Sequence, residues 1–123
     1  LDFVVVNAEN VAAGSGINER IYREIRALGI DVVRNAYGRQ VYSTIAEIQV
    51  SDELGAPPIL PGVFIRAPRI ARLGGDVEVL GRWRGDPVLI RQGCILGATF
   101  HPELTNDRRV HQHFLRMGEK AHV

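Results

Sequence analysis

Residues 94–104 read Cys94-Ile95-Leu96-Gly97-Ala98-Thr99-Phe100-His101-Pro102-Glu103-Leu104. The apolar part predicts a buried strand, with His101 and Glu103 directly behind it. Side chains two residues apart in an extended chain point the same way, so this imidazole and this carboxylate can meet. A base oriented by a carboxylate is part of the apparatus of acyl-transfer enzymes. A capping or purely structural pair is the alternative interpretation.

The composition is that of an ordinary globular domain. Of the 123 residues, 46% are hydrophobic and 24% are charged, which suits one domain with one core. The net charge of +1 gives no reason to expect nucleic acid or an anionic membrane as a partner. No apolar run approaches the ~20 residues of a membrane span. The single Cys excludes an internal disulfide and favours the cytoplasm. The start at Leu1, without Met or signal peptide, suggests a piece of something longer.

Residues 1–33 predict a βαβ unit. The continuous apolar run Leu1–Val6 is typical of a strand buried on both faces of a parallel sheet. A helix is expected over residues 18–28, with Asn18 as a suitable N-cap and Gly29 after its end. A second strand follows at residues 30–33, and the crossover between the two strands should be right-handed.

The same segment resembles the YmdB-type metallophosphoesterases, through Leu1-Asp2-Phe3-Val4-Val5-Val6-Asn7-Ala8-Glu9-Asn10 and Gly29-Ile30-Asp31-Val32-Val33. The resemblance implies that Glu9 and Asn10 derive from ligands of a dinuclear metal centre. The family's other ligands, an early Asp, a later Asn-His and several further His, have no counterpart here. Two oxygen ligands make no tight site for a transition metal, so we treat this pair as a relic and expect no metal and no cofactor.

From residue 34 onward the pattern predicts antiparallel hairpins. Alternating or short apolar runs indicate strands at residues 41–50, 62–67, 77–84 and 87–92, the last two joined by a tight turn at Gly85-Asp86. A helix should close the chain, capped by Thr105 or Asn106.

This helix is predicted to bury one face, formed by Val110, Phe114 and Met117. The resulting fold class is α/β, a single domain over residues 1–123. We expect a mixed sheet with an N-terminal βαβ unit, antiparallel hairpins and the C-terminal helix. The parallel part would come from residues 1–33 and the His101 strand.

Four further stretches resemble the PdxT family, the glutaminase subunits of pyridoxal 5′-phosphate synthase and class I (triad) glutamine amidotransferases. They are Arg34-Asn35-Ala36-Tyr37-Gly38-Arg39-Gln40, Gly62-Val63-Phe64-Ile65-Arg66-Ala67-Pro68, Val88-Leu89-Ile90-Arg91-Gln92-Gly93 and Phe100-His101-Pro102-Glu103-Leu104-Thr105. In that family a Cys attacks the glutamine amide. The resemblance implies that His101 and Glu103 complete the triad, and that Arg34, Ile65 and Arg66 hold the substrate glutamine.

The sequence also departs from the family. It has neither the Gly-Thr-Cys-Ala-Gly elbow of the nucleophile nor the Gly-Gly-Glu-Ser loop, and Cys94 takes no role from the resemblance. We interpret the chain as an engineered or selected chimera of two enzyme fragments without catalytic activity, with a drifted natural protein as the alternative. A glutaminase of pyridoxal 5′-phosphate biosynthesis with residual glutamine binding is the second interpretation, and a phosphodiesterase remnant the third. We expect a homo-oligomer, most simply a dimer, since the short chain offers few helices to cover an apolar sheet.

Overall fold

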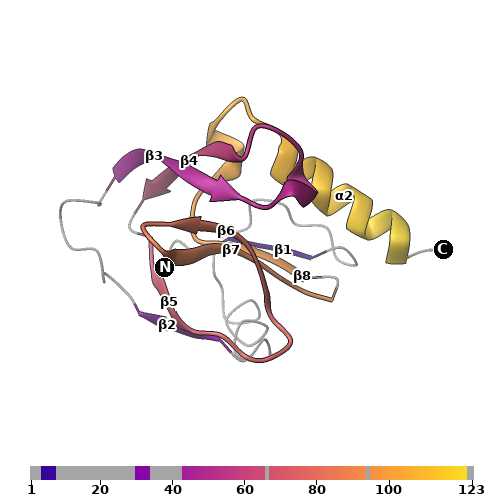
Figure 1. Cartoon of the computed structure of the whole chain (residues 1–123), viewed down its shortest axis with the longest axis horizontal. Coiled ribbons are helices and arrows are strands. Elements are labelled where there is room, and N and C mark those ends of the chain that lie inside the picture. The colour runs from indigo at the N-terminus through magenta and orange to yellow at the C-terminus, as the bar shows by residue number, and fades with distance from the viewer. Residues whose placement is uncertain (1–3, 8–29, 34–42, 66, 94, 122–123) are drawn as a thin grey trace.

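In the computed structural model, six strands form one curled antiparallel sheet, with a helix against it (Figure 1). The structure describes residues 4–7, 30–33, 43–65, 67–93 and 95–121. The strand order is β1-β8-β7-β6-β3-β4. The bounds are β1 Val4–Asn7, β3 Ser43–Val50, β4 Ile59–Ile65, β6 Glu78–Trp83, β7 Asp86–Gln92 and β8 Ile95–Ala98. A second, two-stranded sheet pairs β2 (Asp31–Val33) with β5 (Arg69–Arg72).

The helix α2 (Arg109–Ala121) covers one side of the sheet and completes the main core. Val110, Phe114 and Met117 are all buried in it, so the predicted helix face is confirmed. The helix begins later than Thr105 or Asn106, because a short 3-10 helix, η3 (Pro102–Leu104), precedes it. A second 3-10 helix, η2 (Asp52–Leu54), lies against α2.

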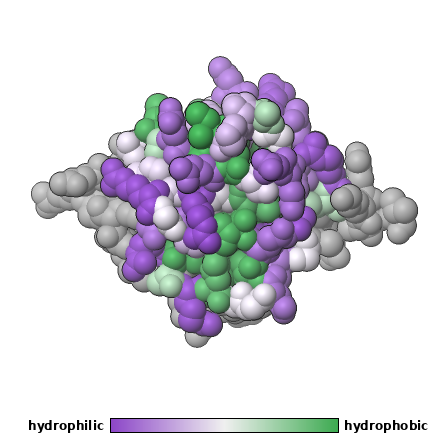
Figure 2. All heavy atoms as spheres, in the orientation of Figure 1, coloured by the Kyte–Doolittle hydropathy of each residue, from purple (hydrophilic) through white to green (hydrophobic). Residues whose placement is uncertain are grey.

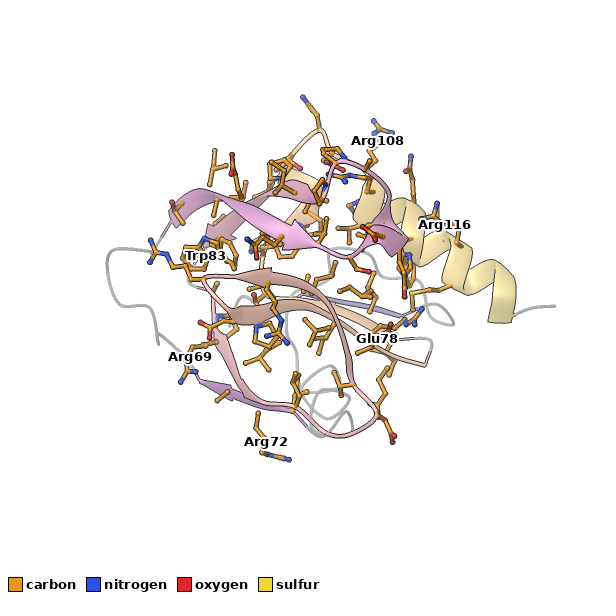
Figure 3. The ribbon with its side chains drawn as sticks, viewed as in Figure 1. Arg69, Arg72, Glu78, Trp83, Arg108 and Arg116 are labelled. Atoms are coloured by element: carbon orange, nitrogen blue, oxygen red, sulfur yellow. The ribbon has the colours of Figure 1, made fainter. Side chains whose placement is uncertain are left out.

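Aromatic side chains fill the end of the core that lies under β3 and β4. The rings of Phe64 and Trp83 stack with their centroids 4.8 Å apart, and Phe100 is tilted against Phe64 at 6.0 Å. Figure 3 shows Trp83 beneath these two strands. Gly62 makes room for this packing: a Cβ there would lie 2.2 Å from Ile48 Cδ1 and 3.2 Å from Phe100 Cδ2.

The hairpins follow the pattern predicted from the sequence. β6 and β7 pair antiparallel, and the turn between them is Arg84-Gly85, one residue earlier than predicted. Both turn residues have positive φ, 51° and 82°, which is the conformation of a type I′ hairpin turn. β3 pairs antiparallel with β4 over seven residue pairs. The α/β class, the antiparallel hairpins and the C-terminal helix are therefore confirmed.

The prediction of a parallel part of the sheet is wrong. β1 runs antiparallel to β8, and β2 lies in the other sheet, antiparallel to β5. Among the described ranges every strand pair is antiparallel, and the helix predicted at residues 18–28 lies outside them. A strand of three or four residues satisfies its backbone on any free edge, and an apolar run does not state which edge or direction.

A small second cluster lies between the two sheets. It buries Ile30, Ile70 and Ile90, and partly buried apolar side chains pack against it: Leu73, Val77, Val79 and Ile95. Figure 2 shows apolar side chains gathered in a band that runs from β3 and β4 towards the connection between β5 and β6, with charged side chains on both sides.

Candidate functional site

The candidate site lies where β8 ends and the chain turns towards α2, beside β4 (Figure 1). Thr99 and Phe100 follow β8 and are completely buried. The backbone N–H of His101 donates to the carbonyl oxygen of Val63, in the middle of β4, at 2.8 Å. The buried strand and this bond fix the backbone of His101 against the sheet.

His101 and Glu103 meet, as the sequence predicts. His101 Nδ1 lies 2.7 Å from Glu103 Oε1, and the two side chains are 19% and 32% exposed. Glu103 sits on η3, whose first residue is Pro102, and Leu104 N–H donates back to the carbonyl of His101 at 3.2 Å. An ionised carboxylate can only accept a hydrogen bond, so this pairing requires a proton on Nδ1, and in a neutral ring the lone pair is then on Nε2.

Nε2 of His101 is buried and makes no hydrogen bond among the described residues. The hydroxyl oxygen of Thr99, two residues earlier, is also buried and also has no hydrogen-bond partner among the described residues. Buried polar atoms nearly always have a partner, so such atoms indicate a site where one is expected. The atom of His101 that is left for chemistry is therefore the one opposite Glu103.

A polar network adjoins η3. Asp107 accepts from Arg109 Nε at 3.0 Å and from Arg109 Nη2 at 2.8 Å. These bonds hold the pKa of Asp107 below its usual value and raise the pKa of Arg109. Neither residue was predicted from the sequence, although the Asn106-Asp107 pair just ahead of a helix is a pattern that indicates a capping carboxylate. A hollow of about 300 Å³ beside them is lined in part by Glu103, Asp107 and His111.

Another charged cluster lies over β6, β7 and α2. Arg91 binds Glu78 and lies 3.7 Å from Glu53 Oε2, and this guanidinium holds the pKa of Glu78 below its usual value. The buried His113 of α2 lines the adjacent hollow of about 370 Å³. Figure 3 shows Glu78 on the sheet and Arg116 on the helix.

Of the predicted glutamine-binding residues, the structure describes one. Ile65 is the last residue of β4 and is partly buried. Arg34 and Arg66 lie outside the described residues, as do Glu9, Asn10 and Cys94. The structure thus brings together His101, Glu103 and β4. Within its described parts, no group of three or more His, Cys, Asp or Glu side chains could hold a metal ion, and no helix is long and apolar enough to cross a membrane.

Comparison with known proteins adds the family. The sequence model described as the SNO glutamine amidotransferase family matches residues 8–120. The chain belongs to this family. The pyridoxal 5′-phosphate synthase subunit PdxT of Thermotoga neapolitana is 48% identical over 101 residues, which cover 82% of this chain and 53% of that protein. The subunit of the same name from Koribacter versatilis is 54% identical over 96 residues, 74% of this chain and 46% of that protein.

A solved glutamine amidotransferase structure superimposes with a TM-score of 0.66 at 48% identity, over 75% of this chain and 47% of that one. The chain thus spans about half the length of the relatives that it matches. The family match begins at residue 8 and so includes most of the segment that we assigned to a metallophosphoesterase. The interpretations as a chimera and as a phosphodiesterase remnant have no support in these comparisons.

Proposed function

We propose that this chain carries the base and the orienting carboxylate of a glutaminase that releases ammonia from glutamine for pyridoxal 5′-phosphate formation. The observation that carries the proposal is the His101–Glu103 pair, with Nδ1 held at 2.7 Å and Nε2 buried without a hydrogen-bond partner among the described residues. Membership of a glutamine amidotransferase family supports the choice of substrate.

The reaction assigns one step to each group. Nε2 of His101 takes the proton from a thiol, whose sulfur attacks the side-chain amide carbon of glutamine. His101 then gives this proton to the departing nitrogen, and ammonia leaves. A water molecule, deprotonated by Nε2 of His101, attacks the thioester carbon; the C–S bond breaks, glutamate is released, and the proton returns from Nε2 to the sulfur. Throughout, Glu103 holds the ring by Nδ1 and stabilises the imidazolium that forms.

The reaction needs a nucleophilic thiol, and the sequence of residues 1–123 does not identify one. The sequence has one Cys, Cys94, and lacks the Gly-Thr-Cys-Ala-Gly elbow of the resembling family. The proposal therefore assigns to residues 1–123 the His–Glu half of the site, and glutamine turnover requires the elbow in addition.

The relatives are named subunits of a synthase, so we propose that this chain also acts beside another synthase subunit. Self-association of this chain stays a prediction. Association with a synthase subunit and self-association are compatible, because a symmetric dimer carries two copies of the same site.

Ammonia release from glutamine tests the proposal. The chain is assayed alone and after mixing with the part of the Thermotoga neapolitana relative that carries the family's Cys elbow. We expect no release above buffer from the chain alone, and release from the mixture that His101→Ala abolishes. Release by the mixture that is indifferent to His101→Ala would contradict the assigned base. Release by the chain alone that Cys94→Ala removes would instead place the nucleophile in this chain.

A further inference from the structure

Arg109, the first residue of α2, binds a segment that lies 50 to 54 residues earlier in the sequence. Its Nη1 donates to the carbonyl oxygens of Gly55 at 2.8 Å and Pro57 at 2.5 Å, and its Nη2 donates to that of Ile59 at 2.6 Å. The side chain is only 14% exposed. One guanidinium thus binds the carbonyl oxygens of every second residue in the loop that leads into β4.

The other edge of the same guanidinium faces the chain that follows the candidate site. Nε and Nη2 donate to the two carboxylate oxygens of Asp107 in the fork geometry that an Arg and a carboxylate share. The backbone N–H of Arg109 also donates to Asp107 Oδ1 at 3.0 Å, and the N–H of Asp107 donates to the Thr105 hydroxyl at 3.3 Å. This network orders the turn between η3 and α2.

The two segments that Arg109 joins are the ones that hold the His–Glu pair. β4 begins at Ile59, and four residues later Val63 accepts the N–H of His101. Glu103 lies on η3, directly before the ordered turn. A displacement of either segment changes the distance between Nδ1 of His101 and the carboxylate of Glu103.

We propose that Arg109 is a positioning residue for the His101–Glu103 pair, acting through β4 on one side and through Asp107 on the other. The inference rests on the proposed function in that the pair is taken as the working base. Within the described residues, the hydrogen bonds of the Arg109 side chain go to Asp107 and to the loop before β4, and none goes to His101 or Glu103. Its role requires the planar fork with donors on both edges, because a Lys ammonium cannot bind three carbonyls and two carboxylate oxygens in one plane.

The test compares Arg109→Lys with Arg116→Lys. Both substitutions keep the charge and both lie on α2 (Figure 3), but Arg116 is exposed and lines the other hollow, with Arg91 and His113. The first readout is the proton resonance of His101 Nδ1–H, assigned by its loss in His101→Gln. In the unaltered chain and in Arg116→Lys we expect a protected, downfield resonance. In Arg109→Lys, with the fold checked by circular dichroism, we expect it to broaden or vanish.

The second readout is glutamine turnover in the mixture with the elbow-bearing chain. A misplacement near 1 Å lowers a rate by about 100-fold, so we expect kcat to fall by about 100-fold in Arg109→Lys with KM unchanged within about two-fold. A general loss of stability would instead lower the amount of active protein and leave the resonance of the remaining folded molecules in place.

The resonance decides the inference even if the chain shows no turnover in any mixture, because it reports the pair alone. A folded Arg109→Lys with an unchanged resonance would overturn the inference and leave the proposed function standing. Should Arg109→Lys fail to fold, Asp107→Asn takes its place, since it removes the carboxylate and keeps the bonds to the loop. We expect Asp107→Asn to weaken the resonance, and an unchanged resonance there overturns the inference equally.

Discussion

The carbonyl oxygen of Val63 accepts the backbone N–H of His101 at 2.8 Å, and through this one bond β4 positions the candidate base. The bond joins β4 to the segment that follows β8, although these two strands are not neighbours in the described sheet. Val63 lies in a strand that is paired over seven residues with β3. The backbone of His101 is therefore held in place by the sheet. Glu103 then needs only the short turn of η3 to reach the ring.

Replacing the carboxylate should remove the orientation of the base. In the mixture with the elbow-bearing chain, we expect Glu103→Ala to lower kcat by about 100-fold or more, because the ring loses its tautomer preference and its stabilised imidazolium. Glu47→Ala, an exposed carboxylate on β3, is the control. Equal rates for Glu103→Ala and the unaltered chain would mean that the pair is structural.

Adding a methyl group at Gly62 should destabilise the core. The new Cβ would lie 2.2 Å from Ile48 Cδ1 and 3.2 Å from Phe100 Cδ2, so the buried side chain of Ile48 must shift within the core. Overpacking of this kind costs about 1–3 kcal/mol of the free energy of unfolding. Urea unfolding measures it, with Gly75→Ala as the control because nothing lies within 4 Å of a Cβ there. Equal midpoints for the two variants would show that the core adapts freely.

Asp107 should make the stability depend on pH in the acid range. Its pKa in the folded chain lies below the usual value of 3.8, because the Arg109 guanidinium favours the ionised form. Such a group contributes stability above the pKa of the unfolded chain, and the contribution is lost as the pH falls through the folded pKa. Hydrogen bonds to a charged group are worth about 1.5–3 kcal/mol.

The comparison is Asp107→Asn against the unaltered chain, unfolded in urea at several pH values. We expect Asp107→Asn to be less stable at pH 6 and the difference to shrink below about pH 4. Asp76→Asn, an exposed carboxylate between β5 and β6, should show no such convergence. A difference that stays constant down to pH 2 would assign the loss to packing and not to the charge.

Self-association should involve the outer face of β3 and β4. β4 ends the strand order of the described sheet, and Ile45 and Ile59 on this hairpin are 75% and 41% exposed. An apolar edge of this kind tends to pair with another chain, and two-fold symmetry is the commonest result. We expect light scattering at micromolar concentration to give about twice 13.6 kDa, and Ile45→Lys to lower that mass. A mass of 13.6 kDa for the unaltered chain would rule the dimer out.

The sequence predicted best what local periodicity encodes. The buried face Val110–Phe114–Met117 and the β6–β7 hairpin lie where the apolar spacing and the Gly85 turn placed them. The meeting of His101 and Glu103 followed from their spacing behind a strand. These predictions depend on neighbours in sequence, and so the chain states them directly.

What the sequence did not predict depends on contacts across the fold. β1 and β2 are too short to carry a signal for their partners, and they pair with β8 and β5. No sequence pattern singles out Arg109 from the other Arg residues of the helix, because its three carbonyl partners lie 50 to 54 residues away. The resemblance of residues 1–33 to another enzyme class rested on short motifs, which the family match from residue 8 does not support.

The tautomer of His101 tests most directly whether this chain holds a base ready for glutamine hydrolysis. Nitrogen NMR of the ¹⁵N-labelled chain, with His101 assigned by His101→Gln, reads which ring nitrogen carries the proton when the ring is neutral. We expect the proton on Nδ1 and the lone pair on Nε2 in the unaltered chain, and an even or reversed preference in Glu103→Ala. A proton on Nε2 in the unaltered chain would contradict the account, because His101 would then have no lone pair to accept the proton of a thiol.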